Sequence, residues 1–326
     1  RKMRRSDVCS ALWRDAFGSL LSATSVIVAG AGPSGLHLAS ALARRGLRVT
    51  VYEPARCGGV RIPLLHACNL PKRGSPLWQA ASAFSRTWYA DATLLPAVER
   101  HVGPFGEYFS IHTRTYLQLL RRRALAVGVQ FVRAPLPAET DSTIFIATGA
   151  AAQPAAPAGW SAALAPLPGW ESYFAMPAQA QPVAEELARR DIRTNYFIHR
   201  DRAGFIHLNG TERTAAQAFA TALHPGQRHA LFHGTRLTTR DRLPIVGFSL
   251  PNEMATFNDL RAAVVQGRLK DLLRQQPGVF FFTGMGYHAM TYSPFLADRA
   301  AKWLTGQAAE DEILLGALTP ARFLPR

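Results

Sequence analysis

The spacing of apolar residues changes twice between residues 25 and 53, which predicts a strand, a helix and a second strand. A short apolar run at 25–29 ends on glycines, and residues 36–43 then repeat apolar side chains at helical spacing. Gly46 follows as a natural helix stop, and residues 49–53 read as a strand again. A strand, a helix and a strand in this order imply a parallel sheet.

The remaining pattern predicts further elements of both kinds. Residues 55–76 are rich in glycine and proline and read as a loop, and 151–182 is a Pro- and Ala-rich stretch whose aromatic residues favour partial packing over a pure linker. Residues 237–247 are rich in turn formers. Helices are predicted at 76–92, 113–128, 212–223, 255–276 and 293–305, and strands at 129–132, 142–150, 194–199, 204–209 and 278–284.

The turn after the first strand contains the clearest ligand-binding pattern in the sequence. The sequence GAGPSG fits G-x-G-x-x-G at Gly30, Gly32 and Gly35, and Glu53 follows Gly30 by 23 residues at the end of the second strand. Glycines in this pattern allow a tight turn, a close approach of the backbone to a diphosphate, and close helix–strand packing. The acid suits a ribose hydroxyl and disfavours a 2′-phosphate. The pattern predicts a dinucleotide site but does not choose between NAD and FAD.

The net charge of the chain suggests a further kind of partner besides a dinucleotide. The formal net charge is +15, and 33 of the 37 basic residues are Arg while four are Lys. Such an excess favours a polyanionic partner, although a solvated basic surface would have the same composition. Candidate contact points are the clusters at 121–123 and 189–190 and the pair Arg200 and Arg202.

Other features narrow the class of protein. No apolar run approaches the ~18 residues of a membrane-spanning helix, so no membrane partner is expected. Three cysteines without a CxxC pair predict a reducing, cytoplasmic setting rather than a disulfide framework. His229 and His233 have metal-compatible spacing only if they lie on a helix, and no third ligand is near, so no metal is expected.

Three stretches in chain order resemble FAD-dependent oxidoreductases: the glycine fingerprint extended through 35–53, the Ala-Thr-Gly at 147–149, and the strand FFFTGMG at 280–286. GTRLTTRDRLPIVG (234–247) resembles the G-x-R-x4-D-x2-P-x2-G element of the amine and amino-acid oxidase superfamily, which includes D-amino-acid, glycine and sarcosine oxidases.

A narrower resemblance covers nearly the whole chain. TRDRLPIVG (239–247), residues 62–92 and the closing stretch 284–323 are similar to the C-terminal flavin domain of the MnmC family of bifunctional tRNA wobble-uridine modification enzymes. Residues 1–5 resemble the end of the methyltransferase domain that precedes the flavin domain in that family. An upstream or separate methyltransferase domain is therefore an expected partner.

This resemblance implies an α/β fold: a Rossmann-like FAD-binding domain with a parallel sheet, plus a smaller antiparallel-sheet substrate domain of the D-amino-acid-oxidase type. It implies non-covalent FAD. The expected division is a tail of an upstream segment at 1–22, a discontinuous FAD-binding domain at 23–75, 111–155 and 231–326, and a substrate domain at 76–110 and 156–230.

The resemblance also assigns the candidate site. Arg236 matches the carboxylate-binding Arg of the G-x-R element, and Tyr287 and His288 lie where the chain is expected to return to the flavin, so these three are the candidate catalytic residues. Asp241 is either a turn-holding or a catalytic acid, and Arg240 and Arg242 face either phosphate or solvent. The expected cofactor-binding residues are Gly30, Ala31, Gly32, Pro33, Ser34, Gly35, Glu53, Arg61, Thr148, Gly149, Gly284, Gly286, Ala289 and Met290.

The implied activity is oxidation of the secondary amine of carboxymethylaminomethyl-uridine at the tRNA wobble position, giving aminomethyl-uridine and glyoxylate. Two alternatives stay open. One is an oxidase of free amino acids or small amines of the glycine and sarcosine type. The other is a degenerate, non-catalytic FAD-binding interaction module, favoured by a shortened loop at 55–63, a short connection at 133–141, and Gly-Tyr-His-Ala at 286–289 where the family has Gly-Ser-Arg-Gly.

Overall fold

The structure is a computed structural model of the 326-residue chain. It describes residues 7–9, 11–12, 25–54, 64–69, 75–103, 106–138, 140, 142–149, 151–152, 163–175, 197–200, 205–210, 230–250, 254–274, 278–307 and 315–325. Among these residues, no helix has both the length and the apolar character needed to cross a membrane.

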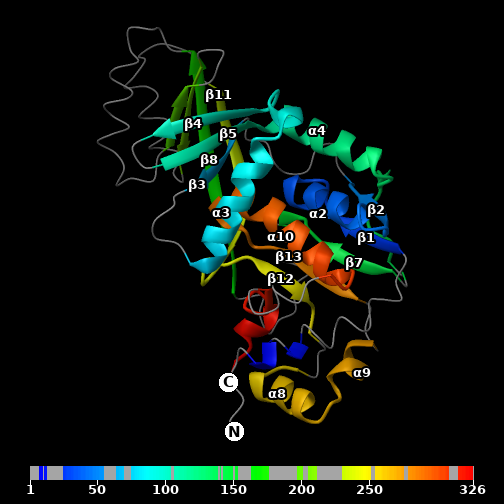
Figure 1. Cartoon of the computed structure of the whole chain (residues 1–326). Coiled ribbons are helices and arrows are strands. Elements are labelled where there is room, and N and C mark those ends of the chain that lie inside the picture. The colour runs from blue at the N-terminus through cyan, green and yellow to red at the C-terminus, as the bar shows by residue number, and fades with distance from the viewer. Residues whose placement is uncertain are drawn as a thin grey trace.

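A six-stranded sheet forms the centre of the molecule, with the strand order β12-β13-β7-β1-β2-β6 (Figure 1). Its pairings are parallel except for that of β12 with β13. The predicted strand–helix–strand unit and its parallel pairing are confirmed. The strands are β1 (Ser25–Ala29), β2 (Arg48–Tyr52), β6 (Gln130–Val132), β7 (Thr143–Ile146), β12 (Ile245–Phe248) and β13 (Val279–Thr283).

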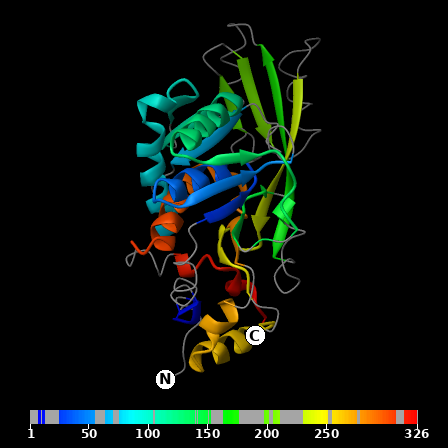
Figure 2. The same cartoon turned by 90° about the vertical axis from the view of Figure 1, so that its right-hand side faces the viewer.

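Helices α2 (Pro33–Ala43) and α10 (Ala289–Leu304) pack on one face of this sheet, and α3 (Pro76–Tyr89) and α4 (Thr113–Ala126) pack against them (Figures 1 and 2). The apolar stripe predicted for α2 is buried with the strands of the sheet in one continuous core. Helix α10 begins at Ala289, four residues before the predicted start, because one short 3₁₀ turn, η4 (Gly286–His288), leads directly into it.

A buried polar chain ties α2 to its neighbours. His37 Nδ1 lies 2.7 Å from Ser293 Oγ on α10, and His37 Nε2 lies 2.7 Å from the hydroxyl of Tyr116 on α4. Trp88 Nε1 of α3 donates to the same hydroxyl at 3.0 Å. Burial, and secondarily the charge of Arg123, lowers the pKa of His37 to about 3, so the imidazole is neutral near pH 7. These hydrogen bonds link helices α2, α3, α4 and α10, and the buried polar groups are satisfied by one another rather than by water.

The described residues also form two antiparallel sheets. One has the order β11-β8-β10-β9 and the other β3-β5-β4. The predicted α/β class with a parallel sheet and separate antiparallel sheets is confirmed, whereas the division into domains at the expected boundaries stays a prediction. The strands are β3 (Leu64–Asn69), β4 (Val98–Gly103), β5 (Gly106–His112), β8 (Leu164–Ala175), β9 (Phe197–Arg200), β10 (Phe205–Gly210) and β11 (Ala230–Thr239).

Several sequence-based assignments needed correction. Residues 55–76 were expected to be loop, but β3 lies within them, because pairing with β5 supplies hydrogen bonds that local pattern does not reveal. The Pro- and Ala-rich stretch 151–182, for which partial packing was favoured over a pure linker, contains β8, a strand that was not predicted. The helix expected at 255–276 is two helices, α8 (Phe257–Val265) and α9 (Leu269–Arg274), separated at Gly267, where φ is +68°. The helix predicted at 212–223 lies outside the described residues.

The far end of the molecule has a small core of its own. Val8 and Leu12 are buried against α8 and against the C-terminal turn η5 (Pro320–Phe323), together with Leu260 and Leu324. Figures 1 and 2 both show α8 and α9 at the end of the molecule opposite α4.

Candidate functional site

The carboxyl ends of the parallel strands bring the predicted cofactor-binding residues to one edge of the sheet. Gly30 follows β1, Glu53 follows β2, Thr148 and Gly149 follow β7, and Gly284 follows β13. Because these strands are parallel neighbours, residues far apart in sequence meet along this edge. In open α/β sheets, ligands bind in the crevice outside the carboxyl ends of the strands.

The three motif glycines serve different purposes. Gly30 has φ +104°, and a Cβ there would lie 2.9 Å from the Ala147 carbonyl oxygen. A Cβ on Gly35 would lie 1.9 Å from the carbonyl oxygen of Gly30, so this glycine lets helix α2 approach its own strand. At Gly32, by contrast, no described atom lies within 4 Å of a built Cβ. Packing of the chain thus explains Gly30 and Gly35, while Gly32 borders open space.

Backbone donors line that space. Pro33 occupies the first turn of α2, which contains no acidic residue and starts its helical hydrogen bonds with Leu36 N–H donating to Gly32 C=O at 3.0 Å. Within the described part of the chain, no acceptor is found for the N–H groups of Ala31, Gly32, Ser34 or Gly35. Unsatisfied donors at the positive end of a helix are suited to an anionic group. A diphosphate fits this arrangement.

The acid at the end of β2 has a partner that sequence reasoning missed. Glu53 Oε2 lies 2.8 Å from Arg121 Nη1 of α4, and the Glu53 side chain is 13% exposed. The same guanidinium lies 4.0 Å from the centre of the Phe131 ring. Stacking on the ring and pairing with the acid fix Arg121 between α4 and β6. Only tertiary packing brings these residues together, so no local signal identified the pair.

The structure brings two of the three candidate catalytic residues into contact. The guanidinium carbon of Arg236, on β11, lies 4.4 Å from the centre of the Tyr287 ring, on η4. Two glycines make this approach possible. Gly284 (φ +71°) and Gly286 (φ +54°) adopt left-handed backbone conformations, and a Cβ on either would lie 3.0 Å from Thr239 or Thr238 of β11.

His288 points into a different environment. Its ring packs edge-on against Trp78 of α3, with 4.5 Å between ring centres. Burial lowers the pKa of His288 below its usual 6.5, which favours the neutral imidazole near pH 7. His288 therefore neighbours the Arg236–Tyr287 pair along the chain but is held by α3, and Trp78 is a further residue of this region that the motifs did not identify.

The segment that leads from β13 into α10 lies beside the glycine turn. Ser34 Oγ donates to Met285 Sδ at 3.6 Å, so the first turn of α2 touches the segment that returns from β13. Ala289 has φ −52° and ψ −40°, an ordinary helical conformation that does not require glycine. Met290 is buried, and its carbonyl accepts a hydrogen bond from Tyr89 at 2.7 Å.

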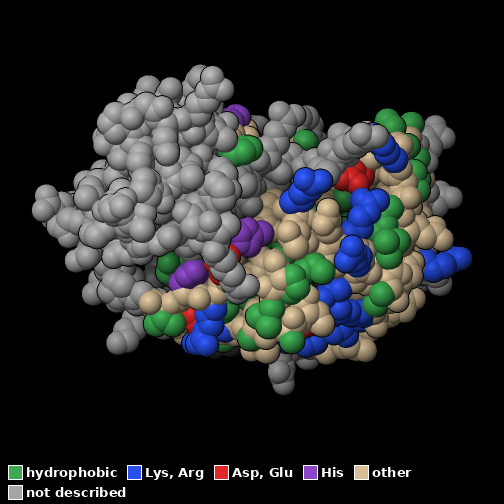
Figure 3. All heavy atoms as spheres, turned by 90° about the horizontal axis from the view of Figure 1, so that it is seen from above, with side chains coloured by type: hydrophobic (Ala, Val, Ile, Leu, Met, Phe, Trp, Pro, Cys, Tyr) green, Lys and Arg blue, Asp and Glu red, His purple; other side chains and the backbone are tan. Residues whose placement is uncertain are grey.

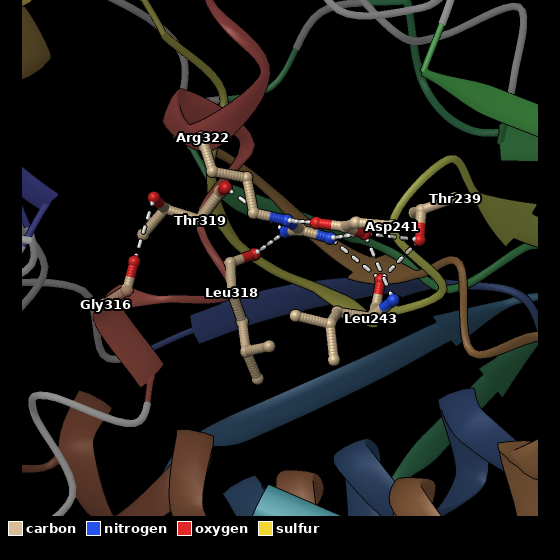
Figure 4. A network of polar contacts seen from close by, with 7 residues as sticks. All are labelled: Thr239, Asp241, Leu243, Gly316, Leu318, Thr319 and Arg322. Atoms are coloured by element: carbon tan, nitrogen blue, oxygen red, sulfur yellow. Dashed lines mark hydrogen bonds and ion pairs between the residues drawn. The ribbon is translucent and has the colours of Figure 1, made fainter. Parts of the chain in front are cut away.

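Asp241, for which two roles were open, holds the turn after β11 (Figure 4). Its carboxylate accepts two hydrogen bonds from Arg322, at 2.7 and 3.2 Å, and others from the Thr239 hydroxyl and the Leu243 N–H. Arg322 also donates to the carbonyls of Leu243 and Leu318. The ion pair thus joins the motif at 239–247 to the C-terminal turn η5, and Asp241 acts as a structural acid.

Replacing Asp241 by Asn is expected to destabilise the fold in a pH-dependent way. Burial alone would raise the pKa of Asp241, but hydrogen bonds and charge from Arg322 outweigh it, with help from Leu243 and Thr239, so this pKa lies below 3.8. Since the folded pKa is below the unfolded value, the stabilisation is present above about pH 4 and is lost as pH falls through the folded pKa.

The expected loss of unfolding free energy in Asp241→Asn is about 1 kcal/mol at pH 7, limited because solvent screens a partly exposed pair. Urea unfolding of both proteins from pH 7 down to pH 2.5 measures the difference, which should shrink below about pH 4. A difference that stays constant across this range would contradict the ion-pair explanation.

Some predicted residues are outside what the structure describes. Arg61 and His229 lie outside the described residues, as do Arg189, Arg190 and Arg202. His233 lies on strand β11, so the helical spacing considered for a metal pair does not apply. In the described ranges, no group of three or more His, Cys, Asp or Glu residues is arranged to hold a metal ion.

Comparison with known proteins supports the fold and the glycine turn. Residues 28–63 match the model of the NAD(P)-binding Rossmann-like domain. No protein with curated annotation matches the chain in sequence.

Solved structures resemble the chain over most of its length. Iminodiacetate oxidase from Chelativorans sp. BNC1 has 16% identity and a TM-score of 0.58, covering 87% of this chain and 96% of the oxidase. Glycine oxidase from Geobacillus kaustophilus has 14% identity and a TM-score of 0.57, covering 92% and 98%. L-amino acid deaminase from Proteus myxofaciens has 11% identity and a TM-score of 0.59, covering 93% of both chains. At this identity the likeness shows a shared fold.

Proposed function

We propose that this protein is an FAD-dependent oxidoreductase that oxidises the CH–NH group of an amine bearing a carboxylate. The observation that carries the proposal is the arrangement at the carboxyl edge of the central sheet. Open backbone donors at Ala31, Gly32, Ser34 and Gly35 lie on one side, and the returning segment from β13 carries Tyr287 against Arg236 on the other. A diphosphate-binding turn and a carboxylate-binding Arg thus belong to one region of the fold.

FAD is the cofactor that these residues favour. The turn 30–35 would hold the diphosphate, and Glu53 would hold the adenosine ribose, where an acid opposes the 2′-phosphate of NADP. Iminodiacetate oxidase, glycine oxidase and L-amino acid deaminase share the fold of this chain, and the resemblance of 147–149 and 280–286 to flavoenzymes agrees. When bound, the flavin supplies a two-electron acceptor for the amine.

Arg121 is expected to strengthen binding of the adenosine half of the cofactor by orienting Glu53. In Arg121→Met, the pair at 2.8 Å is lost and the apo-protein should bind FAD and ADP about fivefold more weakly, the effect of an ion pair worth up to ~1 kcal/mol. Riboflavin binding should be unchanged. Isothermal titration of apo-protein measures all three, with the exposed neighbour Arg122→Met as control. Equal losses for ADP and riboflavin would contradict this role.

The substrate carboxylate is proposed to bind Arg236. A guanidinium presents two parallel N–H donors that match a carboxylate, and stacking on Tyr287 limits its orientations. Iminodiacetate and glycine, named for two of the similar structures, both carry a carboxymethyl group on nitrogen. A carboxymethylaminomethyl group on a uridine also has a carboxymethyl group on nitrogen, but this amine is attached to a nucleoside.

The finer proposal is therefore a tRNA substrate with carboxymethylaminomethyl-uridine at the wobble position. The net reaction consumes water and transfers two electrons to the cofactor, releasing glyoxylate and leaving aminomethyl-uridine. Support comes from the net charge of +15 and from the resemblance of 239–247 and 284–323 to the MnmC family. A cytoplasmic location and a methyltransferase partner, upstream or separate, belong to the same proposal.

In this reaction the chain's own residues orient the substrate and shape the site. Arg236 would hold the carboxylate, and the aromatic face of Tyr287 would border the substrate, since this side chain is 48% exposed. His288 packs against Trp78 and is favoured in its neutral form, so it would add no positive charge to this region near pH 7. Closing the site with Trp78 and Tyr292 around His288 would limit access of water to the reacting carbon.

The test is anaerobic reduction of the purified yellow protein, followed by its visible spectrum. Bleaching by tRNA that carries carboxymethylaminomethyl-uridine, with release of glyoxylate, is the expected result. Bleaching by glycine, sarcosine or iminodiacetate but not by the tRNA would support an oxidase of free amines. A stable yellow protein that no amine reduces would favour a non-catalytic flavin-binding module, and a colourless protein that takes up no FAD would overturn the proposal.

A further inference from the structure

The helix α4 presents an uncompensated basic stripe on the surface. The 31 residues 108–138 contain five Arg and no Asp or Glu, and four of these Arg lie on α4. Figure 3, which looks down on the end of the molecule where α4 lies, shows Lys and Arg side chains spread across the described part of this face with few acidic ones. The stripe defined by Arg114, Gln118 and Arg122 is exposed and recurs every fourth residue along one side of the helix.

The two acidic residues that lie beside α4 are both paired with Arg residues on the inner side of this helix. Glu53 pairs with Arg121 at 2.8 Å, and Asp91 pairs with Arg123 at 2.8 Å. Arg114 and Arg122 make no ion pair with any residue that the structure describes. The two inner Arg are thus tied into the fold, while the two outer ones keep their full charge toward solvent.

We propose that the α4 stripe is the docking face for the phosphate backbone of a structured RNA. Arg114 and Arg122 are about 12 Å apart along the helix axis, which spans several phosphates of a nucleic-acid strand. Both are Arg, whose planar group binds phosphate through two hydrogen bonds. The stripe has no aromatic residue, and Leu125 is the one large apolar residue of α4 that is exposed, so the stripe lacks the apolar face of a membrane-surface helix.

This inference extends the proposed function. It rests on that function for one point, namely that the docked RNA carries the amine to be oxidised. Figures 1 and 2 both show α4 and the strand β11, which bears Arg236, toward the end of the molecule opposite α8 and α9. An RNA docked on α4 would therefore lie toward the same end of the molecule as β11.

The test compares two double variants of the full, FAD-loaded chain with equal change in charge. Arg114→Gln with Arg122→Gln alters the stripe, and Arg261→Gln with Arg268→Gln alters the opposite end, where Asp259 and Asp271 already offset the charge. Fluorescence anisotropy with an unmodified tRNA transcript, at salt concentrations between about 50 and 200 mM, gives the affinity and its salt dependence.

The stripe variant should bind the transcript roughly tenfold more weakly, with the slope of log K against log salt smaller by about two, because two phosphate contacts are lost. The control variant should match the wild type. Both variants should keep the FAD content and visible spectrum of the wild type, since neither pair belongs to the proposed active site.

Equal weakening in both variants would overturn the docking face, because the effect would then follow net charge alone. Wild-type protein that ignores tRNA, or binds anionic vesicles in preference to it, would also overturn it. In that case, reduction by iminodiacetate would leave the oxidoreductase proposal standing as a small-amine oxidase, so the two failures are distinguishable.

Discussion

Gly32→Val is expected to give a folded protein whose affinity for FAD is strongly reduced. Gly32 has φ −71° and ψ 177°, an extended conformation that valine adopts without strain, and no described atom lies within 4 Å of its built Cβ. The branched side chain would instead fill the space beside the backbone donors of the turn. A diphosphate held there by charge-assisted hydrogen bonds would lose about 3 kcal/mol or more, which weakens FAD binding roughly a hundredfold.

The measurement is FAD titration of the apo-protein together with thermal unfolding in the absence of FAD. The apo form of Gly32→Val should unfold near the wild-type temperature, with at most about 1 kcal/mol lost for the poorer helix cap. Gly35→Ala is the contrasting variant, because its Cβ would lie 1.9 Å from the Gly30 carbonyl oxygen and must distort the turn. A yellow, FAD-saturated Gly32→Val protein would refute the assignment of this turn.

Arg236→Ala is expected to keep FAD and to lose oxidation of carboxylate-bearing amines. Removing a bidentate, charge-assisted pair costs about 3 kcal/mol when both hydrogen bonds are made, so kcat/KM should fall at least about a hundredfold. Contact with the Tyr287 ring contributes only about 0.5–1 kcal/mol at a partly exposed site. The fold should therefore survive the substitution.

Anaerobic stopped-flow reduction measures this loss, and the flavin spectrum before mixing measures cofactor content. Arg240→Ala is a matched control, since Arg240 is exposed at the end of the same strand and lies outside the Arg236–Tyr287 contact. Arg236→Lys should recover only part of the rate, because an ammonium is a point charge without the planar fork. Wild-type rates in Arg236→Ala would remove the residue from the site.

Local pattern was sufficient where the determining contacts lie close in the chain. The period of the apolar residues in 25–53 and the three glycines predicted the strand, turn, helix and strand that the structure has. The reason is steric and short-range: Gly35 is needed because its neighbour is Gly30, five residues earlier. The resemblance at 234–247 made Arg236 a candidate site residue, a role that stays a prediction, and the structure places its guanidinium against the Tyr287 ring.

Local pattern failed where a contact joins distant segments. Strands β3, β4 and β5 were not predicted, because their stability comes from pairing with one another rather than from strong alternation. The single helix predicted over 255–276 was divided at Gly267, whose left-handed backbone the periodicity does not report.

By itself, the sequence determined the parallel glycine-turn unit, the basic character of the chain and the candidate carboxylate-binding Arg. Tertiary structure alone decided which acids form ion pairs within the fold: Asp241 with Arg322, Glu53 with Arg121 and Asp91 with Arg123. Ion pairs depend on distances of a few ångströms between segments that packing brings together, and spacing along the chain does not encode those distances. The roles of these acids therefore became clear only in the folded molecule.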